Sequence, residues 1–120
     1  MSQRISIRYD VPLRRYVISM PDHVTLAAIE DLTERFLSAL GTHDAEYGLL
    51  IDTNKHNFES IACLKALREM LEAPQVATSC LAVAFVAPRQ YREPHIASDQ
   101  EGYFDEVDAT HAWLKARMEA

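Results

Sequence analysis

Two stretches near the start of the chain alternate apolar and polar residues. The first runs Ile-Ser-Ile-Arg-Tyr over 5–9, and the second places Tyr16, Ile18 and Met20 on one side of the chain. Side chains of a β-strand point alternately to its two faces, so both stretches predict half-buried strands. The link over 10–14 is short and contains a proline. It therefore predicts an antiparallel hairpin at one side of a sheet.

The hydrophobic period changes to that of a helix after residue 25. Apolar residues recur there at spacings of three and four, namely Leu26, Ile29, Leu32, Phe36 and Leu40. These positions share one face of an α-helix, and the segment 21–25 supplies a proline breaker and two residues that can cap it. Gly41 follows directly, and glycine is common where helices end. We therefore expect an amphipathic helix over 26–40.

Two later stretches are apolar without alternation. Residues 49–51 read Leu-Leu-Ile, and residues 80–87 read Cys-Leu-Ala-Val-Ala-Phe-Val-Ala. Unbroken apolar runs are typical of central strands that are covered on both faces. Between these runs a helix is marked by apolar residues and closed by proline, namely Ile61, Leu64, Leu67, Leu71 and Pro74. A strand, a helix and a strand in this order predict a parallel pair with a right-handed crossover.

The last third of the chain begins with a polar segment. Residues 88–102 hold two prolines and many polar side chains, which predict an irregular loop with at most one helical turn. Tyr103 and Phe104 add a brief strand, and a final helix follows from Asp105. There is no internal repeat, low-complexity tract or linker, so we expect a single α/β domain over 1–120.

Composition and charge exclude several classes of protein. The chain has 120 residues, of which 48% are hydrophobic and 25% charged, as in ordinary globular domains. Its net charge of −6 repels phosphate groups, so we expect no nucleic-acid partner. We interpret two basic clusters, Arg14 with Arg15 and Arg89 with Arg92, as solvated loop charges.

Neither a membrane anchor nor a cofactor is expected. No apolar run is long enough to cross a bilayer and no signal-peptide core follows the first residues, so we expect a cytoplasmic protein without integral membrane association. Cys63 and Cys80 fall in apolar elements and are expected to be reduced core residues. The histidines are scattered and the glycines stand apart. This spacing predicts neither a metal site nor a phosphate-binding loop.

The order of these elements resembles the SpoIIAA-like fold, which is related to the STAS domains of anti-sigma-factor antagonists. The likeness also rests on a strand that ends Leu-Ile-Asp at 50–52, on Tyr-Phe-Asp-Glu at 103–106 and on Ala-Trp-Leu at 112–114. It implies a mixed sheet of four to five strands, an N-terminal antiparallel hairpin plus parallel strands, packed with three or more helices. It also implies a non-enzymatic regulatory or protein-interaction module.

The resemblance draws attention to Ser60. In the antagonists, the loop after this strand carries a phosphorylatable serine at the start of a helix, and the nearest match here is Phe-Glu-Ser-Ile over 58–61. Glu59 stands where the antagonists have aspartate, and no glycine follows Ser60. Ser60 is thus a candidate for phosphorylation or partner contact. From the residues alone we favour the alternative that Ser60 or Asn57 caps the helix.

Polar side chains follow two strands of the predicted sheet. Asp52, Asn54, Lys55 and His56 come after the first strand, and Arg89 comes after the second. The carboxyl ends of parallel strands meet at one edge of a sheet, so these residues predict a shallow strand-end cleft. Such a cleft could bind a small anion through its cations and the nearby helix N-terminus. A polar rim without a ligand is the alternative.

Three classes of function follow from these residues. The first is a surface over 52–60, with Arg89 nearby, that binds a protein partner or a second copy of the chain. The second is a carrier or sensor for a lipid, a nucleotide or a small acid. The third is a small hydrolase using His56, Glu59 and Ser60, but no Gly-x-Ser-x-Gly elbow presents the serine. We therefore expect no enzyme.

Overall fold

A mixed β-sheet forms the middle layer of the molecule. The computed structural model describes residues 4–42, 45–53, 58–87 and 94–119. Within these ranges the sheet has six strands in the order β1-β2-β3-β4-β6-β5. Their bounds are Ser6–Asp10 for β1, Arg15–Ser19 for β2, Tyr47–Asp52 for β3, Cys80–Val86 for β4, His95–Ser98 for β5 and Glu101–Phe104 for β6.

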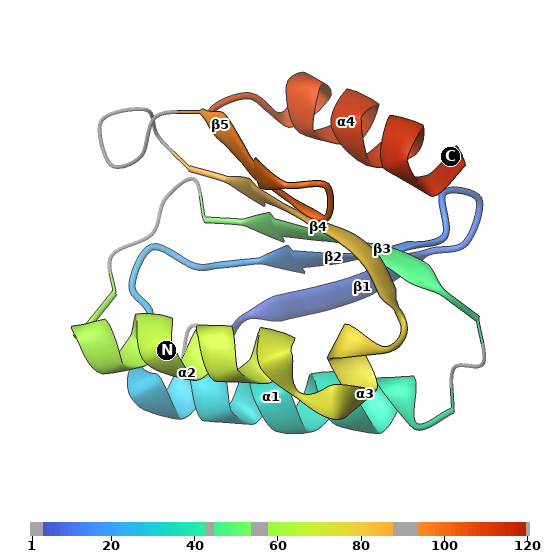
Figure 1. Cartoon of the computed structure of the whole chain (residues 1–120). Coiled ribbons are helices and arrows are strands. Elements are labelled where there is room, and N and C mark those ends of the chain that lie inside the picture. The colour runs from blue at the N-terminus through green and yellow to red at the C-terminus, as the bar shows by residue number, and fades with distance from the viewer. Residues whose placement is uncertain (1–3, 43–44, 54–57, 88–93, 120) are drawn as a thin grey trace.

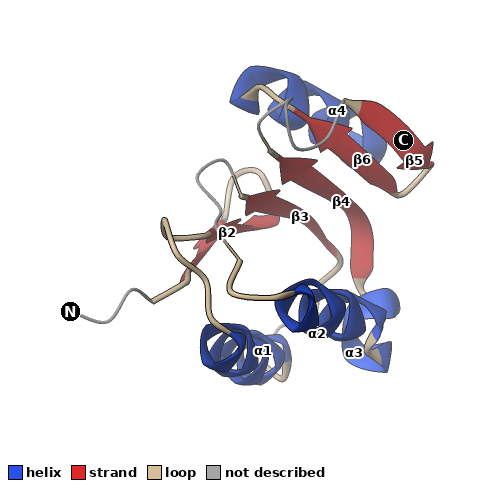
Figure 2. Ribbon diagram, turned by 90° about the vertical axis from the view of Figure 1, so that its left-hand side faces the viewer, coloured by secondary structure: helices blue, strands red, loops and turns tan. Residues whose placement is uncertain are grey.

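Helices cover both faces of this sheet. Their bounds are Leu26–Leu40 for α1, Ile61–Glu72 for α2, Pro74–Ala77 for α3 and Val107–Glu119 for α4. The first three lie on one face and α4 lies on the other, which gives three layers (Figure 1). Figure 2 shows the same layers after a quarter turn, with the sheet twisted between them.

The pairing of the strands confirms the hairpin and the parallel pair that the sequence predicts. β1 and β2 pair antiparallel, and β3 lies parallel to both β2 and β4. β6 continues the parallel part of the sheet beside β4, and β5 closes the edge antiparallel to β6. The carboxyl ends of the parallel strands therefore share one edge of the sheet.

The apolar core is split between the two faces. The larger part lies under α1 and α2 and contains Leu49, Ile51 and Phe36, whereas the smaller part lies under α4 and contains Leu50 and Leu114. Leu49, Leu50 and Ile51 thus point alternately into two cores. This arrangement explains why β3 is apolar without alternation, as we expected for a strand covered on both faces.

Helix α1 agrees with the sequence prediction in bounds and in orientation. Its fully buried residues are Ile29, Leu32 and Phe36. Thr25 occupies the N-cap, where its hydroxyl oxygen accepts a hydrogen bond of 3.1 Å from the Ala28 N–H. This bond satisfies one of the backbone donors that the first turn of a helix leaves without a partner.

The segment 88–102, of which only residues 94–102 are described, was predicted wrongly over that part as an irregular loop. Its second half contains β5 and begins β6, so the sheet has more strands than the four to five that we expected. All residues of β5 are exposed at the edge of the sheet. An exposed edge strand needs no apolar face, because its stability comes from backbone pairing with its neighbour. The hydrophobic pattern therefore carried no signal of it.

Helix α2 exists where predicted, but two of the apolar residues that mark it are not buried. Its buried residues are Cys63, Leu67 and Met70, whereas Ile61 is 83% and Leu64 is 49% exposed. The helix carries two overlapping apolar stripes, and helical spacing alone cannot distinguish which of them packs on the sheet. Ile61 and Leu64 are left in solvent, whereas Leu67 is buried and Leu71 packs against the core.

Candidate functional site

The ends of the central strands are tied together by backbone bonds. Thr53 is buried, and both its N–H and its hydroxyl donate to the carbonyl oxygen of Val86, over 2.8 and 2.7 Å. The carbonyl oxygen of Asp52 accepts a bond of 2.9 Å from the Met20 N–H. These bonds fix the end of β3 against the end of β4 and against Met20.

The start of α2 is also tied to the start of α1. The Glu59 N–H donates to the carbonyl of Val24 over 2.8 Å. The Glu59 carboxylate accepts a bond of 3.2 Å from the Leu26 N–H. This negative charge lies at the positive end of α1, where it stabilises the helix. The glutamate that precedes Ser60 is thus engaged by the neighbouring helix.

Ser60 occupies the N-cap position of α2. Its backbone is extended, with φ −163° and ψ 170°, but its hydroxyl makes no capping hydrogen bond. The residue is exposed. The sequence therefore predicted the position of a cap, but the expected side-chain bond is absent. Asn57, the other candidate cap, lies outside the described residues.

An apolar surface continues from Ser60 along α2. Ile61 and Leu64 lie one turn apart and are both largely exposed, and together with Ser60 they form what we name the Ser60 surface. Large apolar side chains that remain in solvent beside polar ones are a mark of interaction sites. Sequence reasoning used Ile61 and Leu64 only to mark the helix and so missed this feature.

The strand-end cleft can be followed only in part. Asp52 is half-buried at the end of β3, whereas Asn54, Lys55, His56 and Arg89 lie outside the described residues. The cleft and its anion-binding role therefore stay predictions. The same holds for the hydrolytic arrangement, since its histidine is among these residues.

Arg15 is buried, contrary to the expectation of a solvated loop charge. Its exposed fraction is 2%, and its Nη1 lies 2.6 Å from Nδ1 of His111 on α4. Its Nε has no hydrogen-bond partner among the residues that the structure describes. Arg14, by contrast, is exposed as expected, and it reaches the carbonyl of Met118 over 3.4 Å. The hairpin thus holds α4 through two arginines.

The contact with Arg15 determines the protonation of His111. Arginine can only donate, so the histidine Nδ1 must accept and the ring must be neutral. Loss of hydration lowers the pKa of His111, and the positive charge of Arg15 lowers it further, while Asp108 opposes both. The geometry and the direction of the shift therefore agree.

Other candidate groups offer less chemistry. No group of three or more His, Cys, Asp and Glu side chains is placed to hold a metal ion within the part of the chain that the structure describes. Both cysteines are free thiols, and burial raises the pKa of Cys80 to about 12. No helix among the described residues is sufficiently long and apolar to cross a membrane.

Comparison of the fold with solved structures finds two close matches. One is a crystal structure of an uncharacterized protein from the DUF3478 family with a SpoIIAA-like fold, from Shewanella loihica PV-4. It is 16% identical over 95% of this chain and 98% of that chain, with a TM-score of 0.62. The chain has a SpoIIAA-like fold. The resemblance inferred from its element order is therefore confirmed at the level of fold.

The second match shares the same fold. It is an anti-sigma-factor antagonist (STAS) domain protein from Planctomyces limnophilus, 14% identical over 95% of this chain and 99% of that chain, with a TM-score of 0.63. No protein-family profile and no curated protein matches the sequence. At these identities the comparison establishes architecture, and function has to be argued from the site.

Proposed function

We propose that this SpoIIAA-like domain is a single, cytoplasmic and non-enzymatic regulatory module that binds a protein partner through the Ser60 surface. The observation that carries the proposal is the exposure of Ile61 and Leu64 beside a serine hydroxyl that the helix does not use. Full burial of one such side chain contributes about 1.5–3 kcal/mol. A partner that covers both gains a substantial driving force.

The surroundings of the Ser60 surface support this role. Its base is rigid, because Glu59 is bonded to both Val24 and Leu26 and Cys63 is buried beneath it. A rigid surface loses little conformational entropy when a partner binds. The antagonist from Planctomyces limnophilus shares the fold, which agrees with a regulatory module. In this proposal the residues from Asp52 onwards, with Arg89, form the polar rim of the contact.

Ser60 supplies a means to regulate this contact. A phosphate on its hydroxyl would lie at the N-terminus of α2, where the helix dipole favours negative charge. The same phosphate would add a strongly hydrated group beside Ile61, so an apolar partner surface would bind less well. We propose that the unmodified serine is the binding-competent form.

Aspartate in place of Ile61 is expected to reduce partner capture at least tenfold without unfolding the domain. The new carboxylate removes an apolar contact, but it lies in the first turn of α2, where the helix dipole tolerates it. Tagged wild-type and I61D proteins are expressed in the natural host, and co-purifying proteins are quantified by mass spectrometry. S60E, which approximates the phosphate charge, is expected to reduce capture as well.

Val107→Asp is the matched control. Val107 is the first residue of α4, as Ile61 is of α2, and it is 43% exposed on the opposite face of the sheet. V107D should keep the captured protein at the wild-type level. Equal capture by I61D and wild type, with both folded, would contradict the proposed binding surface.

A further inference from the structure

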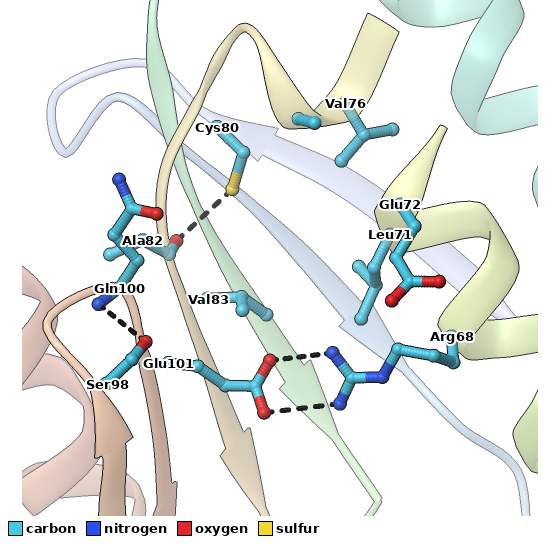
Figure 3. A pocket seen from close by; sticks show the side chains of 11 residues that line it. Arg68, Leu71, Glu72, Val76, Cys80, Ala82, Val83, Ser98, Gln100 and Glu101 are labelled. Carbon is cyan, nitrogen blue, oxygen red and sulfur yellow. Dashed lines mark hydrogen bonds and ion pairs between the residues drawn. The ribbon is translucent and has the colours of Figure 1, made fainter. Parts of the chain in front are cut away.

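A cavity lies at the other end of α2, away from the Ser60 surface. It has a volume of about 320 Å³ and opens between α2, α3, the start of β4 and the β5–β6 turn. Figure 3 shows side chains from all these elements facing the same space. The volume is at the lower end of the range for small-molecule sites. The cavity therefore suits a small ligand.

Part of the cavity wall is apolar, while Ser98 and Gln100 add polar side chains on the side of the β5–β6 turn. Leu71 and Val76 line the side formed by α2 and α3, and Ala82 and Val83 line the side formed by β4. Cys80 adds a neutral thiol to this wall, because burial raises its pKa to about 12. A ligand needs an apolar body to fill this space, since a fully polar one would lose its hydration without replacement.

The cation at the cavity is already neutralised. Arg68 donates to both carboxylate oxygens of Glu101, over 2.7 and 3.2 Å. Tyr103 joins the pair, donating to Glu101 over 2.6 Å and accepting from Arg68 over 3.2 Å. Such a bidentate pair is strong. An anionic ligand would meet the negative charge of Glu101 beside this cation, so the site disfavours anions.

A second carboxylate gives the cavity its net charge. Glu72 lines the same space, is exposed to solvent, and forms no ion pair with any residue that the structure describes. The described charges of the lining are thus one positive side chain, Arg68, and two negative ones, Glu72 and Glu101. The excess is negative, and it lies at the edge of an apolar space. This combination is complementary to a cation with an apolar body.

We propose that this cavity binds a small organic amine, with the ammonium group at Glu72 and the apolar body against Leu71, Val76 and Val83. A primary amine is protonated near neutral pH, as the lysine side chain is. It can donate to carboxylate oxygens while its hydrocarbon part displaces water from the wall. This activity is separate from partner binding at the Ser60 surface.

The test is an NMR titration of the ¹⁵N-labelled protein with three matched probes. Benzylamine, benzyl alcohol and benzoate carry the same ring with a positive, a neutral and a negative polar group. Saturable shifts of the Val83, Gln100 and Glu101 amides are expected with benzylamine, at a dissociation constant of about 1 mM. Benzyl alcohol should bind several-fold more weakly, and benzoate should give no saturable shift.

Charge-removing variants locate the ammonium group. Glu72→Gln is expected to weaken benzylamine binding at least fivefold, whereas E69Q, which removes the same charge from α2 outside the cavity lining, should leave it within twofold. Tighter binding of benzoate than of benzylamine overturns the proposal, as does the absence of saturable shifts with all three probes. Equal losses in E72Q and E69Q also overturn it, because they show only a general charge effect.

Discussion

Leucine in place of His111 is expected to lower the free energy of unfolding by about 2 kcal/mol. His111 supplies the acceptor for the guanidinium of Arg15, which is 2% exposed. In H111L the buried guanidinium lacks this hydrogen bond, but folding still removes it from water at the same cost in free energy. Urea unfolding of wild type and H111L, followed by circular dichroism, measures the difference.

The double variant separates the polar contact from simple packing. Methionine at Arg15 with leucine at His111 replaces both partners by apolar side chains of similar size, and such exchanges are often neutral or stabilising. The loss in the free energy of unfolding is therefore expected to be less than half as large in R15M/H111L as in H111L. An equal or larger loss in the double variant would show that His111 contributes by packing alone.

The same contact makes stability depend on pH. The pKa of His111 is lowered from 6.5 in the folded protein, chiefly by loss of hydration, so the unfolded chain binds the proton more tightly. The stabilisation by His111 is thus complete above about pH 6.5 and is lost as the pH falls below it towards the lowered pKa. The difference in the free energy of unfolding between wild type and H111L should therefore shrink as the pH falls from about 7 to about 5. If the free energies of unfolding of wild type and H111L changed in parallel with pH, this prediction would be refuted.

Alanine in place of Phe36 is expected to have the largest effect on stability, a loss of about 3–5 kcal/mol. Phe36 is fully buried, and its ring meets Tyr16 and Tyr47 edge-on, with centroids 5.3 and 6.2 Å apart. These three rings join α1 to β2 and β3. Since a small domain is stable by only about 5–15 kcal/mol, F36A is expected to be close to unfolding at ambient temperature.

Two milder variants keep this prediction measurable. F36L retains much of the apolar volume and is expected to lose less than half as much as F36A. Val11→Ala, on an exposed residue of the hairpin turn, should change stability by less than about 0.5 kcal/mol. If F36L and V11A unfolded at the same urea concentration, the aromatic contact would not be central to the core.

The regular part of the fold could be predicted because its apolar signals are local. The hairpin and helix α1 each carry a hydrophobic period within a short window, the parallel strands β3 and β4 each carry an unbroken apolar run, and the structure confirms all of them. Strand β5 could not be predicted in this way, because all its residues are exposed. Its pairing with β6 depends on backbone hydrogen bonds, which any residue except proline can make.

The buried arginine shows a second limit of local reasoning. Arg15 and His111 are 96 positions apart in the chain, so the residues near Arg15 in the sequence do not indicate its partner. An arginine at the end of a turn is usually solvated, and the general rule failed here. Only the placement of α4 across the hairpin shows that this cation is covered.

The place of Ser60 in the fold could be predicted from the sequence, but the side chains around it could not. Ser60 does stand at the start of a helix after the strand that ends with Asp52. The apolar half of the surface was missed, since Ile61 and Leu64 fit a buried stripe as well as an exposed one. Their exposure depends on which side of the helix packs on the sheet. The buried residues of α2 are Cys63, Leu67 and Met70.

Hydrogen exchange on the complex with the captured protein tests the central claim most directly. Amides at the start of α2, around Ser60, Ile61 and Leu64, are expected to exchange more slowly in the complex than in the free domain. Those at the start of α4, around Val107, should keep their rates. Protection confined to α4 or to the β5 edge, with α2 unchanged, would contradict the assignment of the Ser60 surface as the site that binds the partner.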